Sequence, residues 1–348
     1  MSPQRAILCG YYGMGNVGDE ALLVSLLQML PESVEPIVLS GNPQKTKERY
    51  GVASCDRTSA LTLLKILSLS DFFIWGGGSL MQDSTSIMSP IYYAGLMALA
   101  QQRGLKTIAW AQGIGPLKRS FTRWLTKQVL LGCDAISVRD AASAELLSSW
   151  QIDYQIAPDP VWALKSAPAP ELPVTDQQIV AVILRSHPLL TAERLQIIIQ
   201  AIQDFQRQSN SFILLLPFQP AQDLAIAKEI AAKLSDSYKV MSLDDPKQIK
   251  GLFKQVTMVI GMRLHSLIMA AAEGCRCSAL SYDPKVSQLM AEVELPGYEL
   301  ANLPVDPQQI SHDWLTQLRQ PGKAQIQIQS LKDRALIQQQ LLRKVILN

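Results

Sequence analysis

The chain has 348 residues, of which 48% are hydrophobic and 18% charged, and its net charge is +2. This composition supports sizeable buried cores and excludes a disordered chain, while the length favours two domains over one. A net charge this small, without a clustered basic face, gives no electrostatic case for a nucleic acid partner. The N-terminus lacks the long apolar stretch of a signal peptide, and charges interrupt the longest apolar region, residues 60–75. We therefore expect a soluble, cytoplasmic protein.

The first half alternates short apolar strands with helical stretches, which is typical of a parallel sheet covered by helices on both faces. The expected strands are residues 6–9, 36–39, 72–75, 107–111 and 135–138, with helices at 21–29 and 91–103. Three prolines follow within residues 166–174. Because proline continues neither a helix nor a central strand, we expect a linker at 166–175.

The second half repeats the alternation after this linker. Its expected strands are 179–184, 212–216, 239–241, 258–260 and 278–281, with helices at 192–206, 221–234 and 246–254. The polar segment 326–347 has helical apolar spacing and is expected to form one long helix. The pattern therefore predicts two doubly wound α/β domains that face a cleft, at 1–165 and 176–348, the second ending in a helical tail.

The first strand runs into a glycine-rich turn before a helix. Gly13, Gly15 and Gly18 match the spacing G-x-G-x-x-G, which lets a backbone approach an anion at a helix N-terminus. A dinucleotide site also needs an acidic residue at the end of the second strand, to hold the ribose. That strand ends in Leu39-Ser40-Gly41-Asn42, without an acid, so nicotinamide binding is disfavoured.

Two more glycine-rich turns follow the third and fourth strands, at residues 76–78 and 113–115. Each alone reads as an ordinary tight turn, but three such turns at one sheet edge form a rim of backbone N–H groups that suits a phosphate or a sugar. The expected contacts on this rim are Gly13, Gly15, Asn16, Gly77, Gly78, Gln82, Asp83 and Gln112.

Asp19 stands at the start of the helix that follows the first turn. One interpretation is a carboxylate favoured by the helix dipole. The other is a side chain that faces the cleft, as a base or as an acceptor for a substrate hydroxyl. The position alone leaves both open.

The segment Gly261-Met262-Arg263-Leu264-His265-Ser266 lies between a buried strand and an apolar helix. Ligands of open α/β sheets bind at this edge. The guanidinium of Arg263 suits a carboxylate or a phosphate, and His265 can exchange a proton near neutral pH. A histidine after a strand is more often a packed residue, but the neighbouring arginine and glycine favour a functional role.

Further cations follow other strands. Lys285 comes one βα unit after Arg263, and Arg139 follows the fifth strand, where a surface pair with Asp140 or Glu145 is the alternative. Together with Arg263 they would form an anion site. His187 also follows a strand, but a loop histidine beside a proline is weak evidence. Carboxylates and histidines with metal-ligand spacing are absent, so we expect no metal.

The chain resembles the polysaccharide pyruvyl transferase family, in particular its CsaB type. The resemblance rests on motifs that occur in the family's order: GYYGMGNVGDEA, GGGSLMQD, AQGIGP, SVRD, GMRLHS and SYDPKV. It implies two Rossmann-like halves similar to B-type glycosyltransferases, with the acceptor side and part of the donor site in the first half. It also implies phosphoenolpyruvate as donor, a pair of sugar hydroxyls as acceptor, a pyruvate ketal as product and no further cofactor.

The motif matches assign roles to individual residues. Arg263, Arg139 and Lys285 match the basic positions that would hold the phosphate and carboxylate of the donor, with Leu264 beside them. His265 would protonate the enol carbon, and Asp19 would take a proton from the sugar. These two are the expected catalytic residues.

The CsaB type further implies N-acetylmannosamine of a cell-wall polysaccharide precursor as acceptor, with a ketal that anchors S-layer proteins. A lipid-linked acceptor would bring the enzyme into transient contact with the inner membrane face, although no amphipathic basic helix stands out in the sequence. The alternative is a nucleotide-sugar-dependent B-type glycosyltransferase, for which Glu273 is the nearest candidate ribose ligand. A non-enzymatic binding protein of two lobes would need an export signal.

Overall fold

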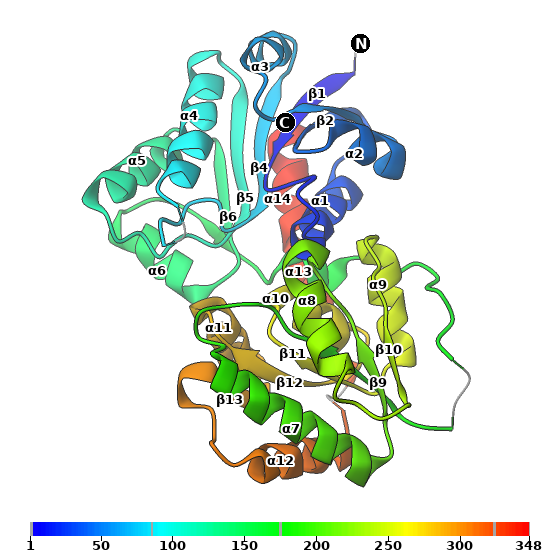
Figure 1. Cartoon of the computed structure of the whole chain (residues 1–348). Coiled ribbons are helices and arrows are strands. Elements are labelled where there is room, and N and C mark those ends of the chain that lie inside the picture. The colour runs from blue at the N-terminus through cyan, green and yellow to red at the C-terminus, as the bar shows by residue number, and fades with distance from the viewer. Residues whose placement is uncertain (1–2, 85, 174–175, 323–324, 348) are drawn as a thin grey trace. The chain divides into compact units, whose positions relative to one another are not determined.

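The computed structural model describes residues 3–84, 86–173, 176–322 and 325–347. The chain forms two compact units (Figure 1), each built on its own sheet. The first unit takes the chain up to Met14, Asp19–Leu164 and everything from Leu331 onward. The second takes Gly15–Gly18 and Lys165–Ser330.

The first unit has a sheet of seven strands in the order β3-β2-β1-β4-β5-β6-β7. All its strand pairs are parallel. The strands are β1 (Gln4–Cys9), β2 (Val34–Ser40), β3 (Ala53–Asp56), β4 (Phe72–Gly78), β5 (Lys106–Gln112), β6 (Ala135–Val138) and β7 (Gln155–Ile156). The helices are α1 (Val17–Met29), α2 (Pro43–Tyr50), α3 (Ala60–Leu67), α4 (Met88–Gln102), α5 (Ser120–Leu131) and α6 (Ala141–Ser149), followed by the 3₁₀ helix η1 (Pro160–Ala163).

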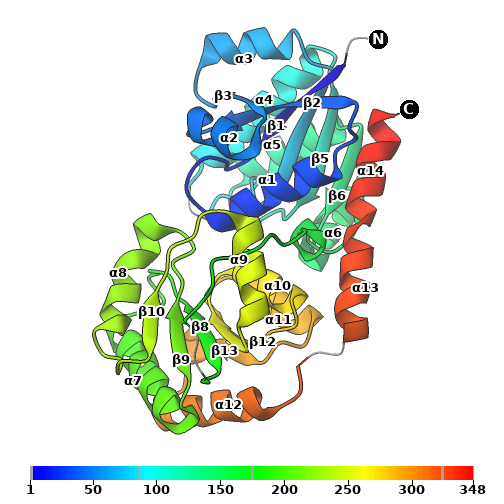
Figure 2. The same cartoon turned by 90° about the vertical axis from the view of Figure 1, so that its right-hand side faces the viewer.

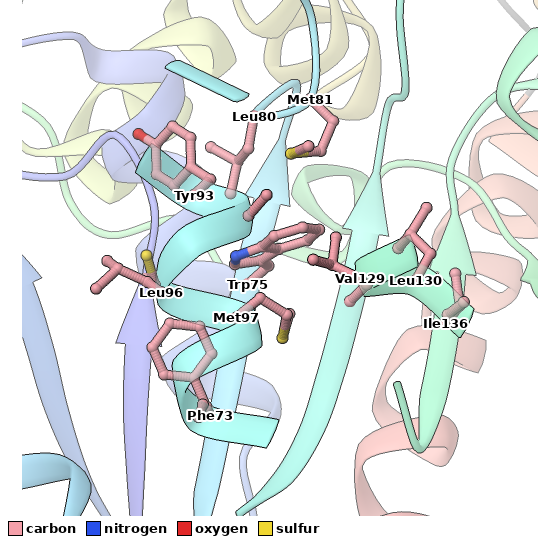
Figure 3. Close-up of a cluster of buried hydrophobic side chains, with 14 of the residues drawn as sticks. Phe73, Trp75, Leu80, Met81, Tyr93, Leu96, Met97, Val129, Leu130 and Ile136 are labelled. Carbon is pink, nitrogen blue, oxygen red and sulfur yellow. The ribbon is translucent and has the colours of Figure 1, made fainter. Parts of the chain in front are cut away.

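The core of this unit lies on both faces of the central strands. Every residue of β4 is buried, as expected for a parallel strand covered on both sides. Figure 3 shows Trp75 of β4 beside Met97 of α4, with Val129 of α5 close by. The apolar run Phe72–Trp75 is therefore a strand because helices bury both of its faces.

The C-terminal tail departs from the prediction in two respects. It forms two helices, α13 (Gln325–Ala335) and α14 (Ile337–Ile346), instead of one, and α14 groups with the first unit. Leu342 and Ile346 are buried in a cluster on the first sheet, and the indole N–H of Trp110 donates to the Gln338 carbonyl at 3.0 Å. Figure 2 shows α14 along β5 and β6. Burial of these side chains fixes the tail to the first unit, which sequence spacing could not reveal.

The second unit has a six-stranded parallel sheet in the order β10-β9-β8-β11-β12-β13. The strands are β8 (Ile179–Ile183), β9 (Phe212–Leu215), β10 (Tyr238–Val240), β11 (Met258–Gly261), β12 (Arg276–Ser281) and β13 (Gly297–Glu299). The helices are α7 (Ala192–Ser209), α8 (Pro220–Ala231), α9 (Pro246–Leu252), α10 (Leu264–Ala272), α11 (Pro284–Glu292) and α12 (Pro307–Arg319), with the short 3₁₀ helices η2 (Phe253–Gln255) and η3 (Leu300–Asn302). Phe205 of α7 meets Trp314 of α12 edge-on at 6.2 Å in its core.

The predicted fold class, α/β with doubly wound parallel sheets, is confirmed. All ten expected strands are present, whereas β3, β7 and β13 were missed. These three stand at sheet edges and lack a long apolar run, so their sequences carry little strand signal. Of the predicted linker, Val174 and Thr175 lie outside the described residues; the preceding part packs on α9, where the Ala167 N–H donates to the Lys247 carbonyl at 2.9 Å. Within the described residues, no helix is both long and apolar enough to cross a membrane.

Candidate active site

The switch point of the first sheet lies between β1 and β4, which is where open α/β sheets bind ligands. Glycines with positive φ stand where these strands end: Gly13 at 72° in the loop after β1, and Gly77 at 80° and Gly78 at 96° as the last residues of β4. Glycine adopts this conformation without the strain that a Cβ would bring. Glu20 fixes the first loop, because its carboxylate accepts the Gly13 N–H at 2.7 Å and the Tyr50 hydroxyl at 2.6 Å. Glu20, the residue after Asp19, therefore stabilises this loop.

Asp19 lies in the first turn of α1 and beside the glycine turn that follows β4. A Cβ added at Gly78 would come within 3.7 Å of Oδ1 of Asp19. Both expectations for this carboxylate, a helix-end charge and an acceptor for a substrate hydroxyl, are compatible with this position. Its role as a base stays a prediction.

Arg139 follows β6 and is buried against a carboxylate. Its Nη1 is 2.5 Å from Oδ2 of Asp159, both side chains are only 6% exposed, and its Nη2 donates to the Ser79 hydroxyl at 3.3 Å. The partner in this ion pair is Asp159, whereas the sequence had offered Asp140 or Glu145 as a surface partner. A Cβ at Gly113 would lie 2.8 Å from Oγ of Ser79 and 3.4 Å from Nε of Arg139, so glycine is needed where β5 ends.

Gln112 and Gln82, the two glutamines expected on the rim, differ in burial and in hydrogen bonding. Gln112 is fully buried at the end of β5, and its amide N–H₂ donates to the Trp110 carbonyl at 2.9 Å. Its Oε1 has no hydrogen-bond partner within the described part of the chain. A buried acceptor of this kind is satisfied by water or a ligand hydroxyl. Gln82 is half-buried and accepts the Ser84 hydroxyl at 2.7 Å.

Asp83 holds a loop together. Its carboxylate accepts the Lys118 and Arg119 backbone N–H groups at 2.8 and 2.9 Å and the Thr122 hydroxyl at 2.6 Å. Burial opposes ionisation, but the hydrogen bonds from Lys118, Thr122 and Arg119 outweigh it and lower the pKa of Asp83 below its ordinary value. The carboxylate is thus committed to organising the start of α5, which favours a structural role over the substrate contact that its motif suggested.

We expect Asp83→Ala to lower the free energy of unfolding by about 2–3 kcal/mol at neutral pH, because three donors lose a charged acceptor. A lowered pKa means that this stabilisation is present above about pH 4 and is lost as the pH falls through the folded-state pKa. Urea titrations at several pH values measure the difference. Unchanged stability together with a raised KM would instead make Asp83 a substrate contact.

The switch point of the second sheet lies between β8 and β11, and Arg263 follows β11. Its side chain is buried against α8, where Nε and Nη2 donate to the two carboxylate oxygens of Asp223 at 3.0 and 2.6 Å. Its Nη1 donates to Oε1 of Gln219 at 3.3 Å. A guanidinium carries five N–H donors, so these bonds hold its plane and leave two for a ligand. Leu264 begins α10 directly beside it.

His265 is the second residue of α10 and lies against the short segment Gly15–Gly18, which groups with the second unit. The Val17 N–H of this segment donates to the Phe218 carbonyl at 3.1 Å, and the Asn16 amide oxygen accepts the Gly18 N–H at 3.2 Å. A Cβ at Gly18 would come within 2.4 Å of Nδ1 of His265. The third glycine of the G-x-G-x-x-G pattern thus leaves room for the imidazole.

We expect Gly18→Ala to lower turnover about 10²-fold, because the added methyl displaces the His265 ring by an ångström or more. The imidazole itself is retained in this variant, so the loss reports its position. Gly95→Ala is the matched control: this glycine lies inside α4, and its added Cβ meets nothing within 4 Å. Steady-state kinetics of both variants decide; normal turnover of Gly18→Ala would remove His265 from the reaction.

Lys285 lies in the first turn of α11, directly after β12. Asp283 caps this helix by accepting the Lys285 backbone N–H at 3.0 Å. The lysine is half-buried at the carboxyl end of a strand that neighbours β11, the strand before Arg263. Both cations thus follow neighbouring parallel strands at the same edge of one sheet, and their contact with a donor stays a prediction.

Arg185, which the sequence analysis did not single out, follows β8 at the same edge. It donates to the Tyr282 hydroxyl at 3.0 Å and to Oε1 of Gln222 at 3.1 Å. The His187 ring packs on the Tyr282 ring at a tilt of 51°, with centroids 4.7 Å apart, and its Nδ1 accepts the Leu189 N–H at 3.2 Å. Burial and the Arg185 charge lower the pKa of His187, so its ring is neutral near pH 7.

The buried carboxylates were the main residues missed. Asp159 and Asp223 hold Arg139 and Arg263, from 20 and 40 residues away along the chain. The one available signal was their place, since Asp223 lies in the first turn of the helix after β9 and Asp159 precedes η1. Among the described residues, no group of three or more His, Cys, Asp or Glu side chains could hold a metal ion.

The architecture can be compared with solved structures. The UDP-GlcNAc 2-epimerase of Methanocaldococcus jannaschii matches with a TM-score of 0.67 at 10% identity, over 99% of this chain and 100% of that one. Alr3699/HepE of Anabaena, solved with UDP-glucose, gives 0.59 at 12% over 98% and 96%, and MurG of Acinetobacter baumannii gives 0.50 at 11% over 99% and 98%. These identities establish the fold alone. The chain has an α/β fold with two parallel sheets that is similar to the fold of B-type glycosyltransferases.

The family model described as polysaccharide pyruvyl transferase matches residues 16–284, well over half of the chain. The chain therefore belongs to the polysaccharide pyruvyl transferase family and is an enzyme of that family. The match spans Asp19, Arg139, Arg263 and His265. A comparison with curated proteins finds no match.

Proposed function

We propose that this enzyme transfers pyruvate from phosphoenolpyruvate to two hydroxyls of one sugar, with release of phosphate. The observation that carries the proposal is Arg263, whose guanidinium is oriented by Asp223 and Gln219 with two N–H donors to spare. A planar fork beside the N-terminus of α10 suits a dianionic phosphate or a carboxylate. Lys285 adds a second cation from the neighbouring strand end.

The proposed chemistry begins with a proton on the enol methylene carbon, given by His265. The adjacent carbon then bonds to a sugar hydroxyl oxygen, which loses its proton, and Asp19 accepts that proton. The oxygen of a second hydroxyl attacks the same carbon, the phosphate leaves with the bonding electron pair, and the proton of this hydroxyl passes to His265, which restores the acid. The product is a pyruvate ketal. Arg139 is proposed to bind an anionic group of the donor, so that Arg139, Arg263 and Lys285 offset its charge.

For the acceptor we propose N-acetylmannosamine in a cell-wall polysaccharide precursor, as in the CsaB type. The ketal would then serve S-layer anchoring, and a lipid-linked precursor would place the enzyme at the inner face of the cell membrane. The support for this subtype is the resemblance of the sequence motifs to the CsaB type, in their order along the chain.

An assay with the purified chain tests the proposal against its rival. The protein is incubated with phosphoenolpyruvate and a synthetic N-acetylmannosaminyl acceptor, and phosphate release and acceptor mass are measured. We expect both to rise together. The same assay with UDP-sugars addresses glycosyl transfer: nucleotide release, with phosphoenolpyruvate left unused, would overturn the proposal.

A further inference from the structure

Helix α5 carries exposed aromatic side chains that the transferase chemistry does not use. Phe121 is 53% exposed and Trp124 is 57% exposed, and their rings stack with centroids 6.2 Å apart. Leu131, the last residue of the same helix, is 54% exposed. Trp124 and Leu131 follow Phe121 by three and ten residues, so the three side chains lie on one side of the helix. Figure 1 shows α5 next to α4, at the margin of its unit.

The same helix is surrounded by positive charge. Residues 117–131 contain Lys118, Arg119, Arg123 and Lys127 and no acidic residue, in a chain whose net charge is only +2. Arg119 and Arg123 are used locally, since Arg119 donates to the Asp83 carbonyl and Arg123 lies over the Trp150 ring at 5.4 Å. Lys118 is exposed just before the helix and Lys127 is half-buried on it, and neither forms an ion pair among the described residues.

The interior of α5 explains why its aromatics face outward. Thr122 and Thr126 are fully buried, and their hydroxyls donate to the Asp83 carboxylate and to the Thr122 carbonyl at 2.6 and 2.7 Å. The inner side also carries Val129 and Leu130, which are buried in the core of the unit. These residues fill the inward face of α5, and Phe121 and Trp124 lie on its outer side.

We propose that this face of α5 docks the enzyme onto a membrane surface rich in anionic phospholipid. Tryptophan and phenylalanine enter the boundary between headgroups and acyl chains, while flanking lysines neutralise phosphates. Exposed apolar side chains on a segment with four cations and no acidic residue match that surface in both polarity and charge, while Asp134 and Asp153 lie near its far end at Leu131. The inference does not depend on the reaction that the enzyme catalyses.

Co-sedimentation of the full chain with vesicles tests the proposal. Vesicles of phosphatidylcholine alone are compared with vesicles that also contain phosphatidylglycerol, at low and high salt. We expect binding only to the anionic vesicles and release by salt. Lys118→Gln with Lys127→Gln should weaken binding on the order of 30-fold, from about 1 kcal/mol for each cation. Phe121→Ser with Trp124→Ser should abolish it.

The control variant combines Leu61→Ser with Lys65→Gln on α3, where Leu61 is 84% exposed and Lys65 also faces solvent. It removes an exposed apolar group and a cation elsewhere in the same unit, and should bind like the parent. Equal loss in this control, binding that the α5 variants leave unchanged, or α5-dependent self-association without vesicle binding would each overturn the proposal. Turnover with a water-soluble acceptor should be the same in all variants, which separates this test from that of the proposed function.

Discussion

Replacing His265 by alanine is expected to lower turnover roughly 10²–10⁴-fold, because positioned proton transfer contributes about that much. The loss should fall on kcat, with the KM for phosphoenolpyruvate little changed, since the cations of the site remain. The fold should also remain, because His265 is half-buried at the start of α10 and lies outside the apolar clusters. Steady-state kinetics and thermal unfolding of the variant measure both.

His312→Ala is the control for this experiment, since His312 is exposed on α12. Its turnover should equal that of the parent. If His265→Ala raised KM and left kcat near normal, the imidazole would bind the donor without moving a proton. Near-normal kinetics in both respects would exclude His265 from the reaction.

Removing Arg263 should cost stability as well as activity. Arg263→Ala leaves the Asp223 carboxylate buried without its partner, so we expect the free energy of unfolding to fall by about 3–5 kcal/mol. Turnover should also collapse, because the donor loses its fork of N–H groups. Urea unfolding monitored by circular dichroism gives the first quantity and the phosphate assay the second.

A double variant separates these two effects. Arg263→Met with Asp223→Leu replaces the buried ion pair by apolar side chains, an exchange that is often neutral for stability. We expect it to regain most of the lost stability while remaining inactive. Activity restored together with stability would show that Arg263 serves the fold alone and does not hold the donor.

The central strands, and the position of Arg263 and His265 at a strand end, could be predicted from the sequence. Buried parallel strands are continuous apolar runs, and Phe72–Trp75 and Met258–Ile260 end in glycine turns that mark the carboxyl edge. Arg263 and His265 follow such a strand directly, so their position could be inferred without tertiary information. The edge strands β3 and β13 could not, because few apolar residues are needed at a sheet margin.

The partners of the site arginines could not be predicted for a physical reason. Asp223 reaches Arg263 only because β9 and β11 stand on either side of β8 in the sheet, and sequence spacing does not encode strand order. The local candidates for Arg139, Asp140 and Glu145, were nearer along the chain than Asp159. Pairing follows the folded geometry.

Helix α5 shows the opposite kind of failure, in which local pattern misleads. Residues 117–131 did not stand out as an amphipathic basic helix, because Phe121 and Trp124 are exposed while Thr122 and Thr126 are buried beside Val129 and Leu130. This mixture weakens the apolar periodicity. Its outer face became visible only through side-chain exposure.

The most direct test of the central claim is to run the reaction in D₂O and analyse the product by mass spectrometry and NMR. Protonation of the enol methylene carbon by an acid that exchanges with solvent predicts a ketal methyl group with one deuteron and one phosphate released for each ketal. An unlabelled methyl group, or an acceptor that gains a sugar while phosphoenolpyruvate is not consumed, would contradict the account.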